Sequence, residues 1–76
     1  MYEVIISPRA RHDLLEILDY IGDDSAAAAE RFSDALLAHT ELIGEFPHMG
    51  EPIDGRRGVR KVLHTPVRIY YRIDEE

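Results

Sequence analysis

The sequence has 76 residues, no cysteine, and nine basic against fifteen acidic side chains, for a net charge of −6. This length predicts a single domain over residues 1–76 with a small core, and a core of that size supplies only about 3–5 kcal/mol of net stability unless a partner assists it. No apolar run approaches a membrane span, no basic secretory start is present, and the four histidines lack ligand spacing, so we expect a cytoplasmic protein without membrane contact, metal or cofactor.

Residues 2–6 predict a short strand at the start of the chain. Tyr2, Val4 and Ile6 lie on one side of such a strand, and its β-branched content favours a strand with one buried face. Ser7-Pro8 then ends the strand and begins a helix, since serine caps a helix and proline fits its first position. A helix therefore follows directly after residue 7.

Two helices are predicted in succession. Apolar residues at a spacing of three and four indicate a first helix from about Pro8 to Ile21 and a second from Ala26 to about Glu45. The four residues 22–25 between them imply an antiparallel helical hairpin. Pro47 ends the second helix, because the residue before a proline disfavours helical geometry. His39 lies on the apolar face of this helix and is expected to be an interior or interface residue.

A loop and two strands complete the chain. Residues 47–58 contain two prolines and three glycines, which is typical of a loop. Residues 59–64 predict a strand whose buried face is not fixed by alternation. Residues 67–73 predict a second strand, with Tyr71 among the apolar residues of one side and Tyr70 between two arginines on the other. Thr65-Pro66 is the expected hairpin connection.

Basic residues concentrate on these last two strands. Six of the nine basic side chains lie within positions 56–72 without an intervening acid. Residues 1–55 carry three basic and twelve acidic groups, a charge of −9, whereas residues 56–76 carry six basic and three acidic groups, a charge of +3. We therefore expect a local basic surface on an acidic body, and no general affinity for nucleic acid.

The order of these elements resembles the ParE/RelE superfamily of toxins from bacterial type II toxin–antitoxin systems. The segments that carry the resemblance are Val4–Ala10, Phe46–Gly50, Val59–Leu63 and Val67–Ile73. The resemblance implies an α+β fold of order β-α-α-β-β, in which a helical hairpin packs on a small, mainly antiparallel sheet. It also implies a cognate antitoxin, ParD-like or similar, that forms a hetero-oligomer with the toxin, and a role in plasmid stabilization.

The resemblance further implies one more strand than this sequence holds. In the superfamily, the segment after Tyr71 leads through a turn into a strand that inserts beside the first strand, and the sequence here ends at Glu76. The expected consequences are closure of the first strand on the last, donation of a strand by a partner or second copy, or an incomplete sheet.

Two activities follow from the resemblance. ParE-like members inhibit DNA gyrase, and this is the favoured function, since the acidic body would be repelled by ribosomal RNA. RelE-like members are ribosome-dependent mRNA interferases, and this alternative would make the protein a ribonuclease. A third reading is a non-toxic, truncated remnant that still binds the antitoxin.

The candidate residues for contact with the target or the antitoxin all lie on the two basic strands. They are Arg60, Lys61, His64, Arg68, Tyr70 and Arg72. In the ribonuclease reading, these residues include types suited to a base, an acid and cations that stabilise the charge on a phosphate. No catalytic residue is predicted.

Overall fold

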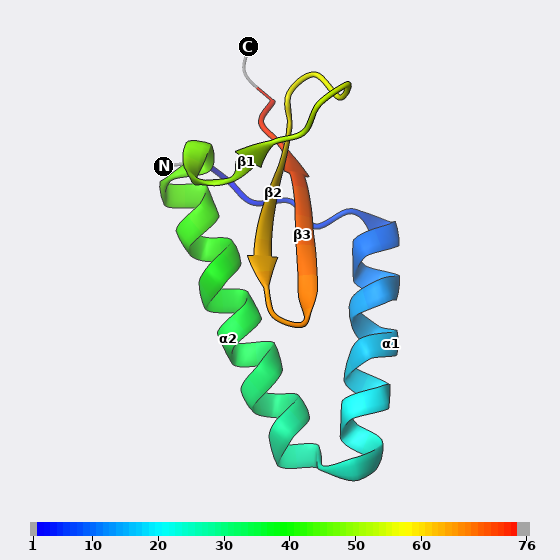
Figure 1. Cartoon of the computed structure of the whole chain (residues 1–76). Coiled ribbons are helices and arrows are strands. Elements are labelled where there is room, and N and C mark those ends of the chain that lie inside the picture. Colours follow the sequence, from blue (N-terminus) through cyan, green and yellow to red (C-terminus); the bar gives the residue numbers. More distant parts are fainter. Residues whose placement is uncertain (1, 75–76) are drawn as a thin grey trace.

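The computed structural model describes residues 2–74 and has two layers, a helical hairpin and a three-stranded sheet (Figure 1). The elements are α1 (Pro8–Asp24), α2 (Ala26–Glu45), the 3-10 turn η1 (Pro47–Met49), β1 (Glu51–Pro52), β2 (Val59–His64) and β3 (Val67–Arg72). The strand order is β1-β2-β3, and both pairings are antiparallel. The α+β class, with a helical hairpin packed on a small antiparallel sheet, is therefore confirmed.

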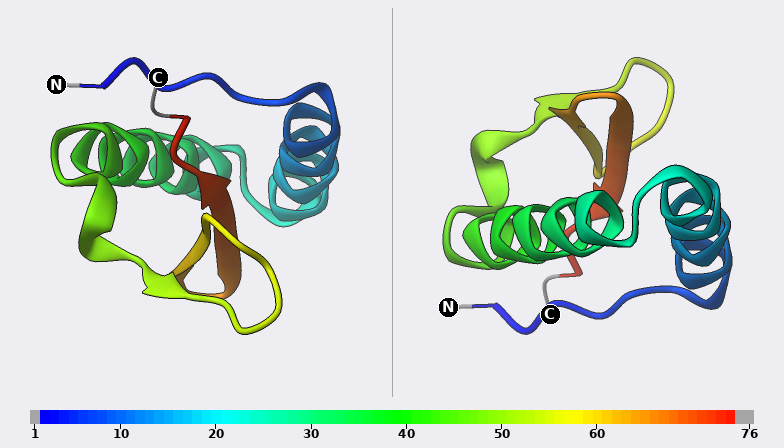
Figure 2. Two further views of the ribbon diagram at one scale, coloured as in Figure 1. Left: turned by 90° about the horizontal axis from the view of Figure 1, so that it is seen from above. Right: turned by 90° about the horizontal axis from the view of Figure 1, so that it is seen from below.

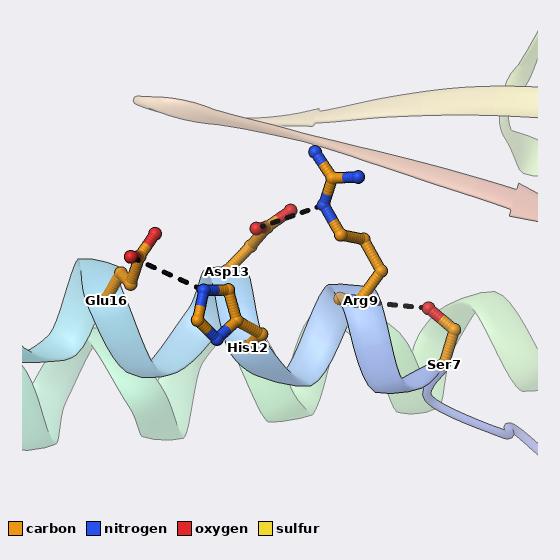
Figure 3. Close-up of polar contacts among 6 residues, drawn as sticks. Ser7, Arg9, His12, Asp13 and Glu16 are labelled. Atoms are coloured by element: carbon orange, nitrogen blue, oxygen red, sulfur yellow. Dashed lines mark hydrogen bonds and ion pairs between the residues drawn. The ribbon is translucent and has the colours of Figure 1, made fainter.

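Helix α1 begins where the sequence predicts. The Ser7 hydroxyl accepts a hydrogen bond from the Ala10 N–H at 3.1 Å, which satisfies one of the unpaired amides of the first turn (Figure 3). Two side-chain pairs between residues four apart follow along the helix: the ion pair of Arg9 with Asp13 at 3.5 Å, and the His12 ring beside the Glu16 carboxylate at 3.4 Å. All four side chains are largely exposed, and exposed pairs contribute little stability. The cap therefore defines this helix start more than these pairs do.

The connection between the helices is shorter than predicted. Helix α1 continues through Gly22 to Asp24, so only Ser25 separates it from α2. The Ser25 N–H donates to the Ile21 carbonyl at 3.0 Å, and its hydroxyl accepts from the Ala28 N–H at 3.1 Å. One residue thus ends the first helix and caps the second, which makes a separate loop unnecessary.

The strand predicted over residues 2–6 is not formed. The Tyr2 N–H donates to the Gly44 carbonyl near the end of α2 at 3.0 Å, and Val4 fills the space beside that glycine. Figure 2 shows this segment and β1–β2 on opposite sides of α2. Alternating residues specify which face of a strand is buried, but a strand also needs a neighbouring edge to pair with. Residues 2–6 pair with neither edge strand of the sheet, β1 or β3.

The two long strands form as predicted, apart from one residue. Strand β2 spans Val59–His64 and β3 spans Val67–Arg72, one residue shorter than expected. The segment expected to be only a loop contains η1 and β1, and β1 adds a third strand beside β2. Gly55 and Gly58 adopt φ angles of +79° and +78° between β1 and β2, a conformation that side chains with a Cβ rarely adopt. The strand implied by the resemblance after residue 74 lies outside the described residues.

The closed core of the described chain is small. Its buried hydrophobic side chains are Ile43 of α2 and Val62 of β2, exposed by 6% and 9%. Large apolar side chains elsewhere remain accessible, among them Ile5 and Tyr20, exposed by 82% and 80%. Contacts between helices and sheet therefore depend on a few specific side chains, which are described below. Within residues 2–74, no helix combines the length and apolar character needed to cross a membrane.

Candidate functional site

Strands β2 and β3 present one face to the helices and one face away from them. Directly opposite residues of an antiparallel pair share a face, and Val62 lies opposite Ile69. Because Val62 is buried, its face is the inner sheet face, which comprises Arg60, Val62, His64, Val67, Ile69 and Tyr71. The outer sheet face comprises Val59, Lys61, Leu63, Arg68, Tyr70 and Arg72. The structure thus fixes the facing of residues 59–64, which their alternation leaves open.

The outer sheet face combines positive charge with exposed apolar surface. Tyr70 and Leu63 are exposed by 60% and 63%, and the three cations of this face surround them. Lys61 lies 3.6 Å from Glu51, and Arg72 lies 3.7 Å from Asp74. Within residues 2–74, Arg68 has no ion pair. The face therefore suits a partner with both acidic and apolar side chains.

Arg60 points to the inner side of the sheet and holds the loop after α2. Its Nη1 atom donates to the Gly50 carbonyl at 2.6 Å and to the His48 carbonyl at 3.3 Å. Hydrogen bonds from a charged donor are among the stronger ones in proteins. Arg60 therefore has a structural contact that explains its presence, and it does not lie with Arg68 and Arg72.

His64 also lies on the inner sheet face. Its Nδ1 atom is 2.8 Å from Nδ1 of His39 on α2, and Phe32 contacts its ring edge-to-face at a centroid distance of 5.6 Å. His39, expected to be an interior or interface residue, is partly buried and lies between α2 and the sheet. Four of the six candidate residues, Lys61, Arg68, Tyr70 and Arg72, thus share the outer sheet face, while Arg60 and His64 lie on the other side.

Tyr71 joins the last strand to the loop after the helices. Its hydroxyl donates to the Pro47 carbonyl at 2.5 Å and accepts from the Gly50 N–H at 3.0 Å. Gly50 leaves the space that the phenol occupies, because a Cβ there would lie 2.5 Å from the Tyr71 oxygen. The expectation that Tyr71 packs inward while Tyr70 remains exposed is confirmed, and residues 47–50 have a structural role.

Sequence reasoning missed Leu63 as a surface residue. Leu63 lies opposite Arg68 on the outer sheet face, and a search for charged side chains does not select a leucine. Its strand position was the available signal, but alternation alone did not say which face of residues 59–64 is exposed. Exposed Arg56 and Arg57 extend the basic character into the loop before β2, beside a shallow depression lined by residues 52–60.

The outer sheet face carries cationic and apolar side chains and one phenol. Its polar groups are two guanidiniums, one ammonium and one phenol, and its six residues include no histidine or carboxylate. Within the described part of the chain, no three His, Cys, Asp or Glu side chains come together as candidate metal ligands. Cations with exposed apolar side chains suit electrostatic steering and docking of a complementary protein.

Comparison with known proteins identifies the family. Residues 4–76 match the family described as the ParE toxin of the type II toxin–antitoxin system parDE. Searches of curated proteins and of solved structures return no match. The match spans both helices, the loop and all three strands of the sheet. With this coverage, the chain belongs to the ParE family of type II toxins, a family that implies an antitoxin partner.

Proposed function

We propose that this chain inhibits DNA gyrase by direct protein contact and is neutralised by a ParD-like antitoxin. The observation that carries the proposal is the family match over residues 4–76. Gyrase acts on DNA in the cytoplasm, so the proposed site of action is cytoplasmic.

The positions of Arg60 and His64 support binding rather than RNA cleavage. A metal-independent ribonuclease needs a base, an acid and cations that converge on one phosphate. His64, the one histidine among the candidates, is hydrogen-bonded to His39 on the inner sheet face, and Arg60 is bonded to loop carbonyls. The cations of the outer sheet face are therefore separated from the histidine that the mRNA interferase reading would use.

The outer sheet face is the proposed contact surface for the antitoxin or the target. Arg68 is its most available cation, since Lys61 and Arg72 each have a carboxylate nearby. Leu63 and Tyr70 add apolar area beside that charge. An acidic segment with apolar side chains at alternate positions would meet both features, and in such systems a flexible antitoxin segment folds along the toxin.

A supercoiling assay with purified gyrase and purified chain tests the proposal. We expect the wild-type chain to inhibit supercoiling, and the charge reversal R68E to weaken inhibition or antitoxin binding by roughly threefold to tenfold. R31E is the matched control, because it makes the same charge change at an exposed position of α2 that lies outside the sheet.

Pulse-labelling of cells after induction separates the alternatives. An early fall in DNA synthesis with intact translation would support gyrase inhibition. An immediate halt of translation would instead favour the mRNA interferase, and no effect on either process would favour a non-toxic, antitoxin-binding form. Equal behaviour of R68E and R31E in all binding and inhibition assays would exclude the outer sheet face as the contact surface.

A further inference from the structure

We propose that His39 and His64 form a pH-sensitive latch that holds the β2–β3 hairpin on helix α2 and loosens when both rings are protonated. The Nδ1 atoms of the two rings lie 2.8 Å apart, and the ring centroids are 5.0 Å apart at a tilt of 50°. The two residues are 25 positions apart in the sequence, and both are partly buried. The contact therefore joins the two layers of the molecule.

The geometry limits how many protons the latch can hold. A hydrogen bond between two Nδ1 atoms needs a proton on one of them and a lone pair on the other. Two neutral rings meet this condition when they adopt opposite tautomers, and one protonated ring meets it by donating to a neutral ring. Two protonated rings cannot, because both Nδ1 atoms then carry hydrogen and both rings carry positive charge. The closed latch accommodates at most one added proton.

The surroundings of the pair offer no compensation for a second charge. The other titratable groups of the inner sheet face are Arg60 and Tyr71, which lie towards the other end of the hairpin and are bonded to the backbone of residues 47–50. On α2, Phe32 packs its ring against His64. The charged side chains of α1 are all exposed, and no carboxylate within residues 2–74 forms an ion pair with His39 or His64. A doubly charged pair would therefore repel without a neighbouring anion.

The latch holds the turn end of the hairpin, because few other contacts hold that end. The buried apolar side chains of the described chain are Ile43 and Val62, and the other polar links between sheet and helical layer run through Tyr71 and Arg60 to the loop after α2. His64 lies at the far end of β2, next to the hairpin turn. Loss of the latch would free this end of the hairpin while the other end remains tied.

The direction of the pH effect follows from proton counting. The open hairpin can bind two protons at the pair and the closed hairpin at most one, so lower pH favours the open state. Histidine takes up its proton between about pH 5 and 8 in proteins. One extra proton in the open state changes the opening equilibrium by at most about tenfold per pH unit. The opening equilibrium therefore depends on pH in one direction, with more open hairpin at lower pH.

Amide hydrogen exchange of the full chain tests the latch. From pH 7.5 to 5.5, after correction for the intrinsic pH dependence of exchange, we expect the opening constant of the β2 and β3 amides to rise about tenfold or more. In H39N, whose side-chain amide can replace Nδ1 without titrating, the change should be less than about twofold. H48Q removes an exposed histidine outside the latch and should behave as the wild type.

Ring nitrogen spectra of the wild type provide a second test that does not depend on a variant folding. At pH 7.5, the two rings should show opposite Nδ1 states, one protonated and one accepting. Two rings that are both protonated only at Nε2 would overturn the latch. A parallel pH dependence of exchange in the wild type, H39N and the corresponding H64N would overturn it as well.

Discussion

The Tyr71 hydroxyl links β3 to the loop that follows α2. We expect Y71F to lower the free energy of unfolding by about 1–2 kcal/mol, because the buried Gly50 N–H loses its acceptor and the Pro47 carbonyl its donor. Urea unfolding followed by circular dichroism measures the change. Y70F is the matched control, since Tyr70 is exposed and should tolerate the substitution within about 0.5 kcal/mol. Equal effects of the two substitutions would contradict this assignment.

The difference between Tyr70 and Tyr71 could be predicted from sequence, whereas that between Arg60 and Arg68 could not. In residues 67–73, apolar and basic side chains alternate cleanly, so facing follows from periodicity. In residues 59–64, both sides of the strand contain a basic and an apolar residue. Only the burial of Val62, which shares a face with Arg60, assigns Arg60 to the inner sheet face. The six candidate residues therefore lie on one hairpin, but two of them face the opposite way from the other four.

Substitution by alanine should have opposite effects on stability at the two helical glycines, Gly22 and Gly44. In α1, a Cβ on Gly22 would lie 3.8 Å from the Ala29 Cβ, an ordinary contact, so G22A should stabilise the chain by about 0.5–1 kcal/mol through helix propensity. In α2, a Cβ on Gly44 would lie 2.8 Å from Val4 Cγ2, so G44A should destabilise it by roughly 1–3 kcal/mol. Thermal and urea unfolding of both variants provide the comparison. A stabilising G44A would show that the N-terminal segment does not pack there.

Helices and hairpin strands were predictable because their signals are local. A serine cap, a proline and a regular apolar spacing define the start of α1 at Pro8, and alternation defines β3. Residues 2–6 have an equally clear local pattern, but whether they form a strand depends on which edge lies beside them. Gly22 was expected to end α1, yet the helix continues to Asp24 and ends at Ser25, whose N–H donates to the Ile21 carbonyl. The difference in residues 2–6 is thus tertiary in origin, whereas that at Gly22 is local.

For the whole molecule, the small core predicts that the stability of the fold depends strongly on a bound partner. With Ile43 and Val62 as its buried apolar side chains, the free chain should be marginally stable. A partner that binds only the folded state adds about 2.7 kcal/mol at a hundredfold excess over its dissociation constant. We therefore expect the antitoxin at that excess to raise the unfolding midpoint by roughly 10 °C or more. Scanning calorimetry at several antitoxin concentrations measures the shift.

The control for this prediction is an antitoxin segment with the same composition in scrambled order. It retains the net charge but loses the pattern of acidic and apolar positions, so it should leave the midpoint nearly unchanged. A midpoint that does not respond to the intact antitoxin at any concentration would show that the antitoxin does not bind the folded chain in preference to the unfolded one.

The single residue between the helices makes the length of this junction as important as its composition. Ser25 is the C-cap of α1 and the N-cap of α2, so no flexible loop residues are present that could accommodate an insertion or a deletion. Ser25 has an extended backbone, so an added residue would change the direction in which α2 leaves α1. Such a change would displace His39 and Phe32 relative to the sheet, although no side chain of either layer had been altered. A tag or domain fused at this junction would therefore disturb the molecule more than one placed in the open turn around Gly55, where a Cβ would meet no atom within 4 Å.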